Sequence, residues 1–311
     1  MRAYTLRDEK IIRVGIKNIP KKGLVWIRCT RLDEESVSKL SELSKIPLAE
    51  LKETFEEDER PKLSVKKYLE LIYHVPHKDN GELMTAPLYF YLSENLIITV
   101  EKEKSQILNN LEESMKKNRL KFLFKKPCGY FLYYIIDKIN DEFLINIDRT
   151  TENLDIFKRS SEHTQVNFKQ LYELSVTSAF FNRALIANIE VLNSLRKTYF
   201  KHLTSSDREL YSELYFDALQ ILDTEKIQRE MISNIFNLES IMSQNRLNLL
   251  IKRLTSIALI IMIPTLITGI YGMNVRNMPL ADSEAGFFMI MSFMFLITVF
   301  LAVLFKVLDW I

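Results

Sequence analysis

Two long runs without any charged residue, close to the C-terminus, constrain this fold more than any other feature. They cover Leu254 to Tyr271 and Gly286 to Phe305, which are 18 and 20 residues. A helix of about 20 residues is needed to cross a hydrocarbon core of about 30 Å. A core helix of a soluble protein, the alternative, usually keeps one polar face, and the second run keeps none. The sequence therefore predicts two membrane spans.

Charge and cysteine content narrow the functional classes. A formal net charge of +2 over 311 residues gives no electrostatic attraction to nucleic acid, so we expect no nucleic-acid partner. Cys29 and Cys128 form no metal or redox motif, which fits reduced thiols in a cytosolic N-terminal part. The chain has no Gly-x-x-x-x-Gly-Lys phosphate loop and no nucleophile–base motif, so we do not expect an enzyme or an ATP-driven pump.

Residues 1–125 alternate between strand-like and helix-like patterns, which predicts a cytosolic α/β domain. Two apolar segments separated by Pro20 and Gly23 predict a pair of strands at 10–19 and 23–29. Further strands are predicted at 62–74, 83–92 and 95–101, and helices at 33–43, 48–55 and 104–117.

The following segment, residues 130–263, contains no glycine and no proline, which predicts very long helices. We expect an antiparallel cytosolic helix pair over 126–205. A single helix over 206–272 would then be about 100 Å long, too long for one globular domain. We expect it to leave the cytosolic part as a stalk. The membrane part is predicted as a first span at about 252–272, an external loop at 273–285, a second span at 286–306 and a cytosolic tail at 307–311.

Basic residues beside the two spans predict their orientation. Lys252 and Arg253 precede the first span and Lys306 follows the second, whereas the loop carries Arg276 together with two acids, Asp282 and Glu284. Basic residues favour the cytosolic side. We therefore expect a multi-pass protein of the cell (plasma) membrane with both termini in the cytosol.

One face of the long helix is lined by small and weakly polar residues. Steps of three and four residues back from Gly272 pass along Gly269, Thr265, Met262, Ala258, Thr255, Ile251 and Asn248, with Leu254 beside them. Small and weakly polar residues are not expected on a surface that faces lipid. They serve either tight helix packing or the wall of a pore built from several copies, because two spans cannot enclose a path alone. In a pore, Met262, Leu254 and Ile251 would form apolar constrictions that gate by dewetting.

The end of the first span carries a specific motif. Tyr271-Gly272-Met273-Asn274, followed by Met278-Pro279, resembles the signature of the CorA family of magnesium channels. The resemblance covers nearly the whole chain, and it includes Asp58 to Lys62, Tyr130 to Asp137, Glu213 to Tyr215 and Gln220 to Thr224. It implies a funnel-shaped homopentamer in the bilayer, in which five long helices line the pore.

The resemblance also implies roles for individual residues. Gly272, Met273 and Asn274 match the external selectivity filter. The pore-lining places fall on Thr265, Met262, Ala258, Thr255, Leu254, Ile251 and Asn248. A regulatory Mg²⁺ is expected between subunits at Asp58 and Glu213. Where the family commonly has Asp-x-x-Asp-His, this chain has Glu213 to Asp217, so Asp217 is the candidate for the shifted second acid; Leu280 stands where Glu is common.

The resulting expectation is a channel that admits Mg²⁺, with Co²⁺ as a second ion, and that cytosolic Mg²⁺ closes. Mg²⁺ would then be both the transported and the regulatory ion. A transporter of Zn²⁺, Co²⁺ or Ni²⁺ on the same fold is one alternative. Borderline metals favour His and Cys ligands, and the small-residue face has neither. A membrane-anchored coiled-coil signalling protein without transport is the other.

Overall fold

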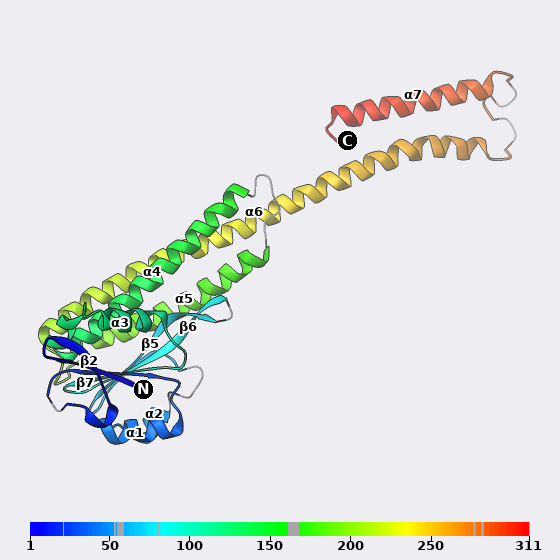
Figure 1. Ribbon diagram of the computed structural model, residues 1–311. Helices are drawn as coiled ribbons and strands as arrows, with labels where there is room; N and C mark the ends of the chain where they lie inside the picture. The colour runs from blue at the N-terminus through cyan, green and yellow to red at the C-terminus, as the bar shows by residue number, and fades with distance from the viewer. Residues whose placement is uncertain are drawn as a thin grey trace. The chain divides into compact units, whose positions relative to one another are not determined.

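The computed structural model describes most of the chain (Figure 1). The described residues are 1–20, 22–52, 54, 59–79, 81–160, 168–275, 278–280 and 283–310, with backbone alone for Lys17 and 155–160. The chain separates into two units, Met1–Ser233 and Asn234–Ile311, and each is described by itself.

The first unit is built on a seven-stranded sheet. The strands are β1 (Arg2–Arg7), β2 (Lys10–Val14), β3 (Val25–Thr30), β4 (Lys62–Val65), β5 (Leu69–Asp79), β6 (Glu82–Leu92) and β7 (Leu96–Glu101). Their order is β2-β1-β3-β7-β6-β5-β4, in which β3 and β7 are parallel and all other neighbours antiparallel. This mixed sheet, together with its helices, confirms the predicted α/β class.

The predicted strand pair at 10–19 and 23–29 is wrong. The strands β2 and β3 form in these regions, but both pair with β1, which lies between them. No strand is predicted for residues 2–7. They form one because Tyr4 stacks on Trp26 of β3, with ring centroids 5.6 Å apart, and is buried in the core. Such a pairing depends on residues distant in the sequence.

The single strand predicted at 62–74 is also wrong, because it contains two strands. Lys66 donates from its backbone to the carbonyl of Tyr68, at 2.9 Å, and this turn reverses the chain between β4 and β5. Pro76, expected near a strand end, lies within β5 opposite Thr85.

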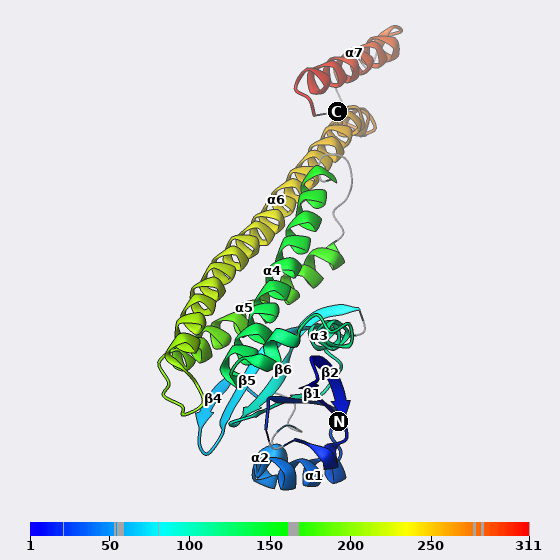
Figure 2. The ribbon, with the colours of Figure 1, turned by 60° about the vertical axis from the view of Figure 1, so that its left-hand side comes forward.

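Helices cover both faces of the sheet (Figure 2). The helices of the first unit are α1 (Glu34–Ser44), α2 (Leu48–Lys52), α3 (Gln106–Lys116), α4 (Cys128–Ser160), α5 (Phe168–Leu195) and the first part of α6 (Ser205–Tyr271), with short 3-10 turns η1 (Ile16–Asn18) and η3 (Lys121–Lys125). Helices α1 and α2 share one core with the sheet, and the remaining helices share the other. Neighbouring strand residues alternate between them: Leu71 and Tyr73 pack with α4, and Ile72 with α1.

Close contacts fix the start of α6 to its neighbours in the first unit. The Tyr211 hydroxyl donates to the carbonyl of Gly129 at 2.7 Å. A Cβ atom on Gly129 would lie 2.6 Å from Asp207 Oδ2, so the approach requires glycine. Further along, the buried Glu225 carboxylate accepts hydrogen bonds from Ser178 and Asn182 of α5, both at 2.6 Å. Polar contacts therefore join α6 to α4 and α5.

The second unit contains the remainder of α6 and α7 (Gly286–Val307). Helix α6 is uninterrupted over 67 residues, which confirms the predicted long helix. Both α6 and α7 contain windows long and apolar enough to cross a membrane, with mean hydropathies of 2.0 and 2.7. At the start of α7, a Cβ atom on Gly286 would lie 2.0 Å from the carbonyl oxygen of Leu280, so the connection returns closely against this helix.

A buried ion network ties the sheet of the first unit to α3. Arg28, which is 2% exposed, donates to Glu101 at 2.7 Å and to Glu112 at 2.9 Å. Glu112 also accepts from Tyr4 at 2.6 Å and from Arg2 at 2.8 Å. Burial opposes ionisation of Glu112, but hydrogen bonds from Tyr4, Arg2 and Lys116 outweigh it and lower its pKa from 4.5 to about 2. The folded state therefore favours the charged carboxylate.

This network predicts a defined pH dependence of stability. Because the folded pKa of Glu112 is depressed, its contribution of about 3 kcal/mol is complete above the unfolded pKa. The contribution is lost as the pH falls from 4.5 to about 2. Glu112→Gln should lower the free energy of unfolding at pH 7. It should also reduce the fall of that free energy between pH 4.5 and about 2. Trp26 fluorescence during urea unfolding, in a Trp310→Phe background, measures both.

Glu113→Gln is the matched control, because Glu113 is an exposed neighbour on the same helix. If the free energy of unfolding falls equally at acid pH in the Glu112→Gln and Glu113→Gln proteins, Glu112 is not the group responsible.

Candidate functional site

The predicted small-residue face is exposed along the membrane part of α6. The side chains of Asn248, Ile251, Leu254, Thr255, Ala258, Met262 and Thr265 are all exposed. A shallow groove runs along this face and is lined by Ala258, Ile261, Met262, Thr265, Leu266, Gly269, Ile270 and Met273. The structure thus brings together predicted members of the pore wall and of the filter. Ile261, Leu266 and Ile270, which border the groove, were not predicted.

The other side of α6 is the covered one. Ser256 is fully buried, and Ile260, Ile263, Ile267 and Tyr271 are half-buried at helical spacing. Within the second unit α7 runs alongside this part of α6 (Figure 1), and its Met294 and Phe305 are buried. The small-residue face lies about half a turn away from the covered side. It is therefore not used for packing against the second span of the same chain.

Thr265 contributes an oxygen of a defined kind to the exposed face. Its hydroxyl donates to the carbonyl of Ile261 at 2.8 Å, one turn back along the helix. A hydroxyl has one proton and two lone pairs. The proton is engaged within the helix, so Thr265 offers only acceptor lone pairs to its surroundings.

The helix ends at the predicted filter. Gly272 donates to the carbonyl of Thr268 at 2.9 Å, and Met273 to that of Ile270 at 3.2 Å. Among the described glycines, positive φ angles occur at Gly23 and Gly81. The backbone at Gly272, where the helix ends, therefore does not require the left-handed conformation that favours glycine. Asn274 is exposed and makes no hydrogen bond with any described residue.

The connection between the spans is described only in part. Arg276 and Asp282, which entered the predicted charge balance of the loop, lie outside the described residues. Glu284 is described and is exposed. Leu280, at φ 63°, occupies the left-handed region, which is costly for a branched side chain. This conformation brings its carbonyl against Gly286.

The predicted regulatory acids lie in the first unit. Asp58 falls outside the described residues, whereas Glu213 and Asp217 are exposed on α6. Burial raises the pKa of Asp217, and repulsion by Asp137 and Asp141 of α4 raises it further. The pKa of Tyr133 is raised by burial and then by Asp137, Glu213 and Asp217. Carboxylates from two helices therefore share one region of negative potential.

Asp137 and Asp141 were not predicted as functional residues. A sequence signal for them exists, because both stand between apolar positions in the first part of the helix pair predicted at 126–205. Each carboxylate pairs with Lys138, at 3.1 and 2.7 Å. Within the described part of the chain, no three His, Cys, Asp or Glu residues are grouped so that they could hold a metal ion.

Known proteins resemble this chain over nearly its full length. The cobalt/magnesium transport protein CorA of Methanocaldococcus jannaschii is 28% identical over 291 residues, which cover 93% of this chain and 92% of that protein. The protein of the same name from Thermotoga maritima is 23% identical and covers 92% of this chain, with 83% of its own length matched. The complete structure of the CorA magnesium transporter from M. jannaschii superimposes with a TM-score of 0.89 at 27% identity, covering 100% of this chain and 98% of that one.

The family model described as CorA-like Mg²⁺ transporter protein matches residues 21–307, from β3 to the end of α7. The match leaves out β1 and β2 and includes the other strands of the sheet, the long helix α6 and the second apolar helix α7. The chain therefore belongs to the CorA-like Mg²⁺ transporter family, and it is a membrane transporter of divalent cations.

Proposed function

We propose that this chain forms a homopentameric channel that admits Mg²⁺ to the cytosol along a path lined by α6. The exposed small-residue face, directed away from α7 and continuous with Met273 of the predicted filter, supports the proposal. Two spans per chain cannot enclose a water-filled path, so the face requires copies of itself around an axis. We propose the same domain limits for the channel as the sequence predicts.

The membrane potential supplies the driving force. With both termini in the cytosol, Gly272, Met273 and Asn274 lie at the external mouth. An inside-negative potential of 100 mV favours entry of a divalent ion by about 4.6 kcal/mol. No coupled chemical step is required for influx.

The filter suits a hydrated ion. Mg²⁺ is small and releases its water reluctantly. A ring of five Asn274 side chains offers amide oxygens that accept hydrogen bonds from this water, without replacing it. Amides bind more weakly than carboxylates, which permits release into the pore. The relatives named cobalt/magnesium transport proteins support Co²⁺ as a second ion.

Below the filter, the pore wall would alternate between acceptors and apolar rings. Thr265, Thr255 and Asn248 provide oxygen atoms, and Thr265 is already oriented as an acceptor. Met262 and Leu254 provide apolar rings between them, with Ala258 leaving space for water, and Ile251 provides a further apolar ring above Asn248. Apolar rings close a pore by expelling water, which makes them the gate of this proposal.

Cytosolic Mg²⁺ would control that gate through the acids of the first unit. Asp58, Glu213 and Asp217 are the proposed sites, with each ion bound between neighbouring subunits. Burial raises the pKa of Asp217, and repulsion by Asp137 and Asp141 raises it further, so carboxylates of the two helices already repel one another. A bound divalent ion relieves this repulsion and stabilises the closed ring, and its loss allows the subunits to separate.

Removal of the filter amide tests ion selection. Asn274→Ala should reduce Mg²⁺ flux into liposomes by about tenfold, the equivalent of about 1.4 kcal/mol, because five acceptors are lost at once. Asn153→Ala makes the same change at an exposed position of α4 and should leave flux unchanged. Unaltered uptake and selectivity in Asn274→Ala, or Zn²⁺ or Ni²⁺ flux exceeding that of Mg²⁺ in the unmodified protein, would contradict the proposal.

Neutralisation of the stalk acids tests regulation. In Glu213→Gln/Asp217→Asn, weaker ion binding should raise the internal Mg²⁺ concentration that halves the flux, by roughly threefold to tenfold. Flux at low internal Mg²⁺ should persist, which separates regulation from conduction. Glu209→Gln, an exposed acid near the start of α6, is the control. An unchanged half-inhibiting concentration in the double variant would remove these acids from the mechanism.

A further inference from the structure

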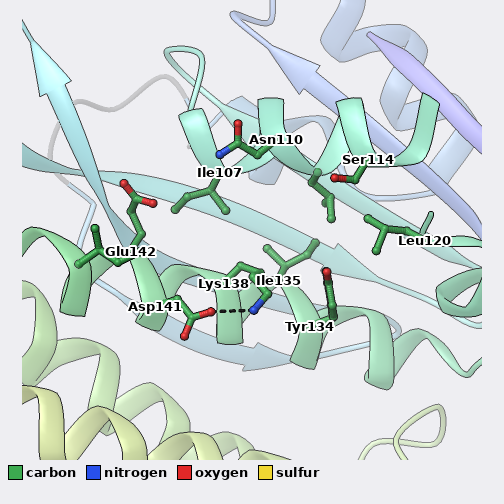
Figure 3. A pocket seen from close by; sticks show the side chains of 11 residues that line it. Ile107, Asn110, Ser114, Leu120, Tyr134, Ile135, Lys138, Asp141 and Glu142 are labelled. Atoms are coloured by element: carbon green, nitrogen blue, oxygen red, sulfur yellow. Dashed lines mark hydrogen bonds and ion pairs between the residues drawn. The ribbon is translucent and has the colours of Figure 1, made fainter. Parts of the chain in front are cut away.

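A cavity of about 200 Å³ lies between α3 and α4 in the first unit (Figure 3). Its apolar wall includes Leu111, Leu120 and Ile135, which are buried. Ile145, also in the lining, is 43% exposed. A small, partly enclosed apolar cavity with a few polar groups is typical of small-molecule sites. The lining of this cavity includes none of the proposed pore-lining or regulatory residues.

The one lysine in the cavity lining is already compensated. Lys138 forms ion pairs with Asp141 at 2.7 Å and with Asp137 at 3.1 Å. Its ammonium also lies over the ring of Tyr134, 5.7 Å from the centroid. With two carboxylates and an aromatic face around it, Lys138 has little remaining capacity to attract an anionic ligand.

The excess charge in the cavity is negative and is located at Glu142. The lining carries one cation, Lys138, and two carboxylates, Asp141 and Glu142. Glu142 accepts only a long hydrogen bond from Asn146, at 3.4 Å, through its side chain, and no cation of the described chain pairs with it. In Figure 3 its carboxylate lies at one end of the cavity, and Tyr134 lies at the other.

The two ends of the cavity therefore differ in chemical character. Eight residues of α4 separate Glu142 from Tyr134, which corresponds to about 12 Å along the helix. Ile135 lies between them, and Asn110 of α3 lies across from Glu142 (Figure 3). The Asn110 carbonyl oxygen accepts from Gln106 at 3.0 Å, and its amide nitrogen is the atom on the side of Glu142 (Figure 3). One end thus offers acceptors for an ammonium group, and the remainder offers an apolar and aromatic surface.

We propose that this cavity binds a small organic cation, a primary ammonium joined to a short hydrocarbon or aromatic body. The ammonium donates to the Glu142 carboxylate. The body lies along Leu111 and Ile135 toward the Tyr134 ring. Bound there, the ligand contacts α3 and α4 together.

Calorimetric titration of the full chain in lipid nanodiscs tests this site, with phenethylammonium as the probe. A ligand of this size should bind with a Kd on the order of 1 mM. Neutral 2-phenylethanol should bind more weakly, and the anion 3-phenylpropionate more weakly still. Glu142→Gln should weaken phenethylammonium binding by about tenfold, because a charge-assisted hydrogen bond is lost. Asp148→Asn, an exposed acid on the same helix, should not.

A second variant separates the cavity from a general effect of charge. Ser114→Phe places a ring in the cavity from its half-exposed rim, keeps Glu142, and should abolish binding of all three probes. Tighter binding of the anion would identify Lys138 as the recognition group and overturn the proposal. Equal binding of the cation and the alcohol, or full binding by either Glu142→Gln or Ser114→Phe, would overturn it as well.

Discussion

The continuity of α6 from the first unit into the second is the constraint on which the rest of the structure depends. In hydrocarbon, backbone polar groups must be satisfied within the protein, and helical hydrogen bonds do this for most of the membrane part of α6. Pro264 has no N–H, so the carbonyl of Ile260 lacks its helical donor. The same helix is held in the first unit by Tyr211 and Glu225. A single secondary-structure element therefore belongs both to a folded core and to a candidate membrane span.

Local sequence patterns were sufficient for the parts of the fold that depend on neighbouring residues. The long helix followed from the absence of glycine and proline over 130–263, and the helix predicted at 33–43 begins at Asp33, which accepts from the backbone of Ser36 at 2.8 Å. The strand β1 was missed because it pairs with β3, which is distant in the sequence. The turn between β4 and β5 contains no glycine or proline, so the two strands were predicted as one. The Arg28 to Glu112 contact joins residues 84 positions apart, and no spacing in the sequence indicates it.

The candidate site likewise has one part that local sequence patterns predicted and another that depends on packing. The period of the long helix predicted which residues share the exposed face, and the structure adds that α7 covers the other side. The regulatory region was predicted less completely, because Asp137 and Asp141 come close to Asp217 only through the packing of α4 against α6. Resemblance supplied the roles of Gly272, Met273 and Asn274, which physical reasoning from the residues alone gives as a polar helix end.

The hydroxyl of Thr265 has a consequence for the sign of charge that its face accommodates. A group that has given its proton to its own helix can receive hydrogen bonds but cannot donate one. Water around a cation points both protons outward, so it finds acceptors there. Water around an anion directs one proton to the ion and turns its oxygen partly outward, and this oxygen finds no donor on the hydroxyl. A ring of such hydroxyls would therefore favour hydrated cations although it carries no charge.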